Sequence, residues 1–262
     1  MNPTLHLVAV IAISAIAGAM NAVAGGGTLL TFPALIGLGI PPLTANATST
    51  VALWPGSASS FWGYRRELRG ARQWAIGFAI PSLLGGAVGA LLLLATDERT
   101  FSALVPWLVL GATVLFMGQG PLGAWLRRRQ APAAGDSRAD GTDRFPKTRL
   151  LVFQFLIGIY GGYFGAGAGI LMLAALGLMG LTNIHRMNGL KNWGGLCMNA
   201  VAAITFAVSG LVNWPVAASM AVGAIGGGYL GSRGAQRVSQ RTVRWVIIGI
   251  GLFSGVWLLL NQ

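Results

Sequence analysis

Residues 21–39 read NAVAGGGTLLTFPALIGLG, so three consecutive glycines, Gly25, Gly26 and Gly27, interrupt an apolar helical pattern. Each glycine costs about 1 kcal/mol against alanine inside a helix. A broken helix in lipid also exposes backbone N–H and C=O groups, which is tolerated only where protein or an aqueous cavity surrounds them. The stretch therefore predicts that one helix ends before the glycines, that a short helix follows them, and that the break faces an interior site.

The composition indicates a membrane protein. Of the 262 residues, 54% are hydrophobic and only 9% are charged, whereas a soluble domain carries about 25% charged residues. Apolar stretches of about 20 residues recur along the chain without the alternation of a membrane β-barrel. We predict an all-α polytopic protein whose surroundings are the lipid bilayer. The single cysteine, Cys197, allows no disulfide within the chain, and we expect no cofactor and no metal site.

The charges predict the orientation of the chain in the membrane. Most of the 18 Lys and Arg residues fall in three hydrophilic stretches, at 65–72, 127–149 and 233–244. Because these stretches punctuate apolar helices, the net charge of +12 indicates cytoplasmic loops and not a nucleic-acid partner. The loop near residue 97 and the turn near residue 210 are then external.

The chain repeats itself. The segment GAMNAVAGGGTLL (18–30) aligns with GIYGGYFGAGAGI (158–170), which places Gly25 over Gly165 and Gly27 over Gly167. A shift of two residues aligns two further pairs of segments, 44–50 with 186–192 (Asn46 over Asn188) and 85–90 with 227–232. We therefore predict a first transmembrane repeat at 1–120, a flexible cytoplasmic linker at 121–148 and a second repeat at 149–262.

The two predicted repeats have opposite orientations. The basic stretch at 65–72 is expected inside, while its equivalent near residue 210 is expected outside. Inverted repeats are typical of secondary transporters, in which the substrate binds near the midplane where the repeats meet. Each repeat has five apolar segments, which in the first repeat are 4–24, 28–40, 44–63, 73–95 and 101–120.

The second segment of each repeat is short. Residues 28–40 would form a helix of about 20 Å, which is less than the hydrocarbon thickness of about 30 Å. The equivalent segment of the second repeat is 168–182. Hydropathy and the repeat together predict about 8–10 membrane segments, and whether the two short ones cross the membrane stays open.

The glycine breaks predict an anion site. A helix that starts at a break presents unpaired N–H groups and a partial positive charge, although such glycines could instead serve only close helix packing. All six acidic residues lie in hydrophilic stretches, which argues against a cation or proton-relay transporter. Lys191, on the same helix face as Asn188, is predicted to face the cavity; the alternative is that it extends to the lipid headgroups. The predicted binding residues are Asn21, Gly25, Gly26, Gly27, Thr28, Asn46, Thr48, Thr50, Gly165, Gly167, Asn188, Lys191 and Asn192.

Several of these motifs resemble a known family. The segments AGGGTLLTFPAL (24–35), GIPPLTANATSTVALWPG (39–56), GIYGGYFGAGAGIL (158–171) and MNGLKN (187–192) resemble the TauE/SafE sulfite exporter family. The resemblance implies a multi-pass permease of the bacterial inner membrane for sulfite, sulfoacetate or other small organic anions. Some family members carry an Asn-Lys pair in the first repeat, where this chain has Ser49-Thr50, so its lysine occurs in the second repeat only.

These observations lead to one expected function and two alternatives. We expect export of a small anion such as sulfite, sulfoacetate or a related organosulfonate, which an inside-negative potential would drive outward. An anion channel or facilitator for another small organic anion stays open. An intramembrane enzyme using Ser57 is disfavoured, because the chain has only two histidines, His6 and His185. A homo-oligomer stays open as well, since nothing in the sequence fixes the number of copies.

Overall fold

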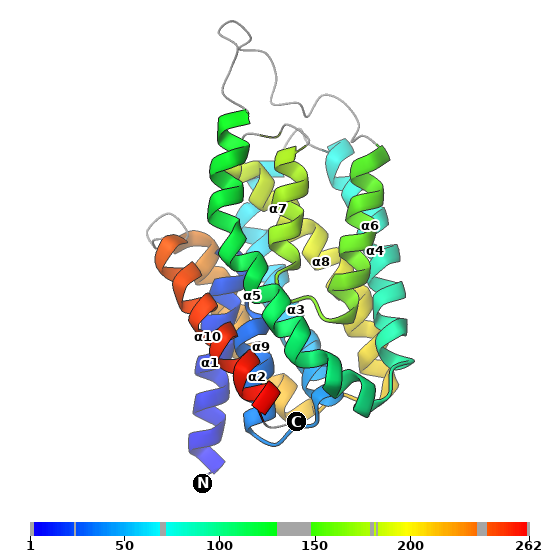
Figure 1. Cartoon of the computed structure of the whole chain (residues 1–262), viewed down its shortest axis with the longest axis vertical. Helices are drawn as coiled ribbons and strands as arrows, with labels where there is room; N and C mark the ends of the chain where they lie inside the picture. Colours follow the sequence, from blue (N-terminus) through cyan, green and yellow to red (C-terminus); the bar gives the residue numbers. More distant parts are fainter. Residues whose placement is uncertain are drawn as a thin grey trace, which may run out of the picture.

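The computed structural model describes residues 3–23, 25–68, 72–129, 148–178, 181, 183–234 and 240–260 (Figure 1). Within these ranges the regular structure is entirely helical, with no strand, which confirms the predicted all-α class. The first half contains α1 (Pro3–Val23), α2 (Thr28–Gly37), α3 (Pro42–Tyr64), the 3₁₀ turn η1 (Arg65–Leu68), α4 (Arg72–Leu94) and α5 (Glu98–Arg129). The second half contains α6 (Thr148–Tyr163), α7 (Ala168–Leu178), α8 (Ile184–Ser209), α9 (Trp214–Gly234) and α10 (Gln240–Leu260).

One boundary differs from the expected one. Helix α5 continues to Arg129, so residues 121–129, which were expected to belong to the linker, are helical. The physical reason is that Ala, Leu and Arg in the stretch AWLRRR (124–129) are good helix formers. Residues 130–147 lie outside the described residues, so the predicted flexible cytoplasmic linker stays a prediction there.

The two helices that follow the glycine breaks are short. Helix α2 has 10 residues and α7 has 11, which corresponds to about 15 Å and 17 Å at 1.5 Å per residue. Neither is long enough to cross about 30 Å of hydrocarbon by itself. Helix α2 lies toward the end of the bundle that holds both chain termini, and α7 lies toward the opposite end (Figure 1).

Small residues allow the long helices to pack closely. Helix α1 packs against α9, and α6 packs against α4. Helices α3 and α8 contact each other; α3 also contacts α9, and α8 also contacts α4. A Cβ added to Gly89 would overlap the backbone of α6 at Ile159, and one added to Gly227 would overlap the backbone of α1 at Ala15. Close backbone approach through small residues is the usual way in which helices associate in membranes.

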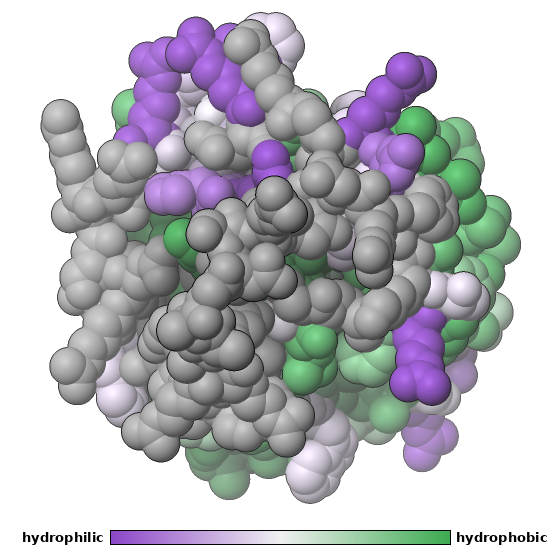
Figure 2. All heavy atoms as spheres, turned by 90° about the horizontal axis from the view of Figure 1, so that it is seen from above, coloured by the Kyte–Doolittle hydropathy of each residue, from purple (hydrophilic) through white to green (hydrophobic). Residues whose placement is uncertain are grey.

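The outer surface is apolar. Exposed large side chains include Leu84 and Leu91 on α4, Leu230 on α9 and Phe253 on α10. Figure 2, which is seen from above Figure 1, shows green apolar side chains along the right edge of the molecule and groups of purple hydrophilic ones at several places around the rim. Within the described residues, two helices are long and apolar enough to cross a membrane by length and composition, Arg72–Leu94 and Glu98–Gly118. This surface is consistent with a polytopic helical membrane protein.

Candidate functional site

The two glycine breaks lie against each other. A Cβ added to Gly25 would lie 3.0 Å from the Cα of Gly169, and one added to Gly169 would lie 3.2 Å from the Cα of Gly25. Gly25 precedes α2, and Gly169 belongs to the first turn of α7. The N-terminal ends of the two short helices therefore approach each other, although the breaks are far apart in the sequence.

The first break is closed by backbone and side-chain hydrogen bonds. Gly25 has φ +82°, a conformation that favours glycine, and its N–H donates to Met20 O at 3.1 Å. The N–H of Gly27 donates to the side-chain Oδ1 of Asn21 at 3.3 Å. Helix α2 then begins as the N–H of Thr31 donates to Gly27 O at 3.1 Å. The amide side chain of Asn21 thus bridges the break.

The second break has the same backbone geometry but a different bridge. Gly165 has φ +80°, and its N–H donates to Tyr160 O at 3.1 Å. The hydroxyl of Tyr160 donates to Ala166 O at 2.5 Å, and the N–H of Ile170 donates to Gly167 O at 2.9 Å. A phenol therefore spans the break here, where the first break uses an amide.

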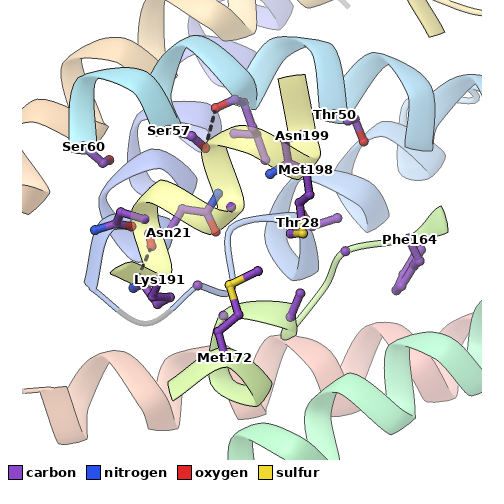
Figure 3. A pocket seen from close by; sticks show the side chains of 17 residues that line it. Asn21, Thr28, Thr50, Ser57, Ser60, Phe164, Met172, Lys191, Met198 and Asn199 are labelled. Carbon is purple, nitrogen blue, oxygen red and sulfur yellow. Dashed lines mark hydrogen bonds between the residues drawn. The ribbon is translucent and has the colours of Figure 1, made fainter. Parts of the chain in front are cut away.

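A cavity of about 50 Å³ lies where the breaks meet. Helices α1, α2, α3, α7 and α8 contribute its walls, and Figure 3 shows their side chains converging from several directions. Among the predicted binding residues, seven line this cavity: Asn21, Gly25, Thr28, Thr50, Gly165, Lys191 and Asn192. None of the described residues that line it is acidic.

Lys191 contributes the positive charge of the cavity. Its side chain is buried, with 3% of its surface exposed, so it does not extend to the lipid headgroups. Its Nζ lies 3.5 Å from Asn21 O, 3.3 Å from Ala22 O and 3.5 Å from Val23 O. These carbonyls belong to the last turn of α1, where the helix dipole favours a cation. The distances exceed the usual 2.7–3.2 Å of an N–H···O bond, so the ammonium is held loosely.

Asn192, which follows Lys191, presents a donor without an acceptor. Its side chain is buried and lines the cavity, and its Nδ2 makes no hydrogen bond to any described residue. Buried polar atoms are nearly always paired with protein or water. An amide NH₂ group without an acceptor among the described residues, in a cavity that Lys191 also lines, is suited to an anion.

The other six predicted residues lie outside the lining. Asn46 Nδ2 donates to Tyr163 O, at the end of α6, at 2.9 Å, and Thr48 Oγ1 accepts from the N–H of Asn213 at 3.0 Å. These bonds join α3 to the end of α6 and to the turn before α9. The remaining four, which are buried but do not line it, are Gly26, Gly27, Gly167 and Asn188.

Several lining residues are absent from the predicted set. Ser57 and Ser60 extend the face of α3 that starts at Thr50, and their spacing on one helix face is a signal that could have identified them. Ser57 Oγ donates to Leu53 O at 3.3 Å. His185, which an enzymatic role of Ser57 would require nearby, is exposed and does not line the cavity. The other lining residues that have large side chains and were not predicted are Leu53, Phe164, Met172, Met198 and Asn199.

The chain is similar to bacterial membrane transporters over most of its length. It is 29% identical over 240 residues to a "Probable membrane transporter protein" of Haemophilus influenzae, with 89% of this chain and 86% of the relative covered. It is 29% identical to "Probable membrane transporter protein ORF9" of Sinorhizobium sp (97% and 93% covered) and 27% identical to "Probable membrane transporter protein YfcA" of Escherichia coli K12 (95% and 88%). No solved structure matches the chain. The model of the family described as "Sulfite exporter TauE/SafE" matches residues 10–258, and the chain therefore belongs to this family of membrane transporters.

Proposed function

We propose that this membrane transporter exports a small sulfur oxyanion, sulfite or a related organosulfonate such as sulfoacetate, across the bacterial inner membrane. The observation that carries the proposal is the cavity where the breaks meet. It is lined by Lys191 and by Asn192, whose Nδ2 has no acceptor among the described residues, and none of the described lining residues is acidic. A dehydrated anion needs such donors, because uncompensated charge in a low-dielectric interior is costly.

The cavity has room for a small oxyanion. Its volume of about 50 Å³ exceeds the roughly 10–15 Å³ that one water molecule needs.

The helix packing supports an inverted repeat. In the repeat alignment, α1 corresponds to α6, α3 to α8 and α4 to α9. Accordingly, α1 contacts α9 as α6 contacts α4, and α3 contacts α9 as α8 contacts α4. The aligned glycines also match: Gly86 packs against the backbone of α8 at Met198, and Gly228 against the backbone of α3 at Gly56. The positions of α2 and α7 toward opposite ends of the bundle (Figure 1) accord with this arrangement, which is common in secondary transporters with midplane sites.

Flux measurements test the proposal. Purified protein is reconstituted in liposomes loaded with sulfite, and efflux is followed with and without an imposed inside-negative potential. We expect efflux to rise with the potential, since it provides about 2.3 kcal/mol per charge per 100 mV. We expect Lys191→Gln to lower the rate at least about tenfold, whereas Arg72→Gln, at an exposed position outside the cavity, leaves it unchanged. Absence of sulfite efflux from folded wild-type protein would refute sulfite as the substrate.

A further inference from the structure

A second hollow lies where α3 and α9 end, and it shares no residue with the cavity where the glycine breaks meet. Its volume is about 180 Å³. The two helices come close here, because a Cβ added to Gly63 of α3 would overlap the side chain of Ser232 of α9. Its walls come from the end of α3, from η1 and from the end of α9: Trp62, Gly63, Arg65, Arg66, Tyr229 and Arg233.

Three guanidinium groups surround this hollow. The Arg65 guanidinium lies over the Trp62 ring at 4.2 Å from its centroid, and the Arg233 guanidinium lies over the Tyr229 ring at 4.5 Å. Arg65 Nη1 also donates to Trp62 O at 2.6 Å, which uses one of the five N–H donors of a guanidinium. Stacking on the rings orients the planar groups, and their remaining donors suit the oxygens of a phosphate.

An exposed apolar stripe on α9 leads to the hollow. Val222 is 65% exposed, Ile225 is 46% exposed and Tyr229 is 36% exposed, and spacings of three and four residues place them on one helix face together with Arg233. Trp62 is also exposed. Trp and Tyr concentrate at the boundary between hydrocarbon and headgroups. The stripe therefore suits acyl chains, and the hollow above it lies at the level of the headgroups.

We infer that this hollow binds the phosphate of an anionic phospholipid, with an acyl chain along the α9 stripe. Basic pockets between membrane helices bind such headgroups, and a zwitterionic lipid would bring its own ammonium toward three arginines. The apolar stripe distinguishes a lipid from a free phosphate ion. The bound lipid would join the ends of α3 and α9 next to Ser60, whose Oγ donates to Gly228 O at 3.3 Å. The inference does not depend on the identity of the transported anion.

Native mass spectrometry in mixed micelles tests this inference with dioleoylphosphatidylglycerol and dioleoylphosphatidylcholine as probes. The double variant Arg65→Gln/Arg233→Gln is compared with Arg72→Gln/Arg149→Gln, which removes two exposed charges outside the hollow. Arg65 and Arg233 line the hollow and the control residues do not. Because a basic residue close to an anionic headgroup contributes about fivefold to its binding, we expect the first variant to lose at least about tenfold. We expect the control to change less than about twofold and the wild type to prefer phosphatidylglycerol.

Three results would overturn the inference. Equal loss in both double variants would indicate only general electrostatic attraction. Equal binding of the two lipids by the wild type would show that the arginines do not select an anionic headgroup. A third comparison distinguishes a lipid from a free phosphate ion. We expect the variant Val222→Ser/Ile225→Ser to bind phosphatidylglycerol more weakly than the wild type. We also expect that millimolar inorganic phosphate does not displace the lipid. Unchanged binding by that variant together with displacement by phosphate would instead assign the hollow to free phosphate.

Discussion

The two glycine breaks share one backbone design but differ in their side chains. In each break a glycine with positive φ donates its N–H to the residue five positions before it, Gly25 to Met20 O and Gly165 to Tyr160 O. The first break is then bridged by the amide of Asn21, and the second by the phenol of Tyr160. Of these two bridging residues only Asn21 lines the cavity.

The helices that precede the breaks, α1 and α6, differ in the side chain that their last carbonyls bind. The last carbonyls of α1 receive the Lys191 ammonium, whereas Tyr163 O, at the end of α6, receives the neutral amide of Asn46. The two breaks are therefore alike in backbone geometry. Among the described residues that line the cavity, the one basic side chain, Lys191, lies at the end of the helix before the first break.

The largest expected effect concerns the place where the breaks touch. Alanine at Gly25 would adopt an unfavourable positive φ, which costs about 1–2 kcal/mol, and its Cβ would press on Gly169 at 3.0 Å. We expect the free energy of unfolding in detergent to fall by about 3 kcal/mol and transport to be lost. Gly39→Ala is the matched control, because Gly39 has φ +80° with no atom near its Cβ position. Equal losses in the two variants would show that the breaks do not press on each other.

The Asn46 amide offers a second test of the comparison. Asn46→Leu removes the donor to Tyr163 O and leaves that carbonyl without this partner, so we expect a loss of about 2 kcal/mol in unfolding free energy. Substrate affinity should change less than about threefold, because Asn46 does not line the cavity. Denaturant unfolding and sulfite binding to the same samples measure both quantities. A large loss of affinity at unchanged stability would move Asn46 into the binding site.

The substitution Asn192→Leu is expected to lower sulfite affinity without lowering the stability of the fold. Asn192→Leu removes a buried donor that has no acceptor among the described residues, so we expect stability to be unchanged or to rise by about 1 kcal/mol. Sulfite affinity should fall about tenfold, the loss expected for a hydrogen bond to a charged group. Thermal unfolding and binding assays provide the two readouts. If stability falls and affinity persists, the amide has a structural role.

The smallest expected effect concerns the bridge of the second break. Tyr160→Phe removes the hydrogen bond to Ala166 O, and we expect about 1 kcal/mol of destabilisation with no change in substrate affinity. Asn21→Leu at the first break should instead lower affinity, since Asn21 lines the cavity. The pair is measured by the same unfolding and binding assays. A similar loss of affinity in both variants would mean that the breaks are functionally equivalent.

Much of the helical layout could be predicted from the sequence. Hydropathy and the positions of the glycine breaks locate helices such as α2 and α4 to within a few residues. The spacing of Lys191 from Asn188 predicts that both lie on one face of a helix, but it does not predict which residues contact that face. The contacts of Lys191 with the end of α1, and of Asn46 with the end of α6, depend on how distant helices pack. Periodicity identifies the face of a helix and not the partner of that face. This is why Asn46 and Thr48 were predicted to bind the substrate but lie outside the cavity lining.

The most direct test of the account is equilibrium binding of radiolabelled sulfite to the purified protein and to Lys191→Gln. Arg99→Gln, an exposed substitution outside the cavity, serves as the control, and an unfolding assay confirms that each variant is folded. We predict one saturable site in the wild type, at least about tenfold weaker binding in Lys191→Gln, and no change in Arg99→Gln. Wild-type affinity in folded Lys191→Gln would contradict the central claim that the two breaks form an anion site around this lysine.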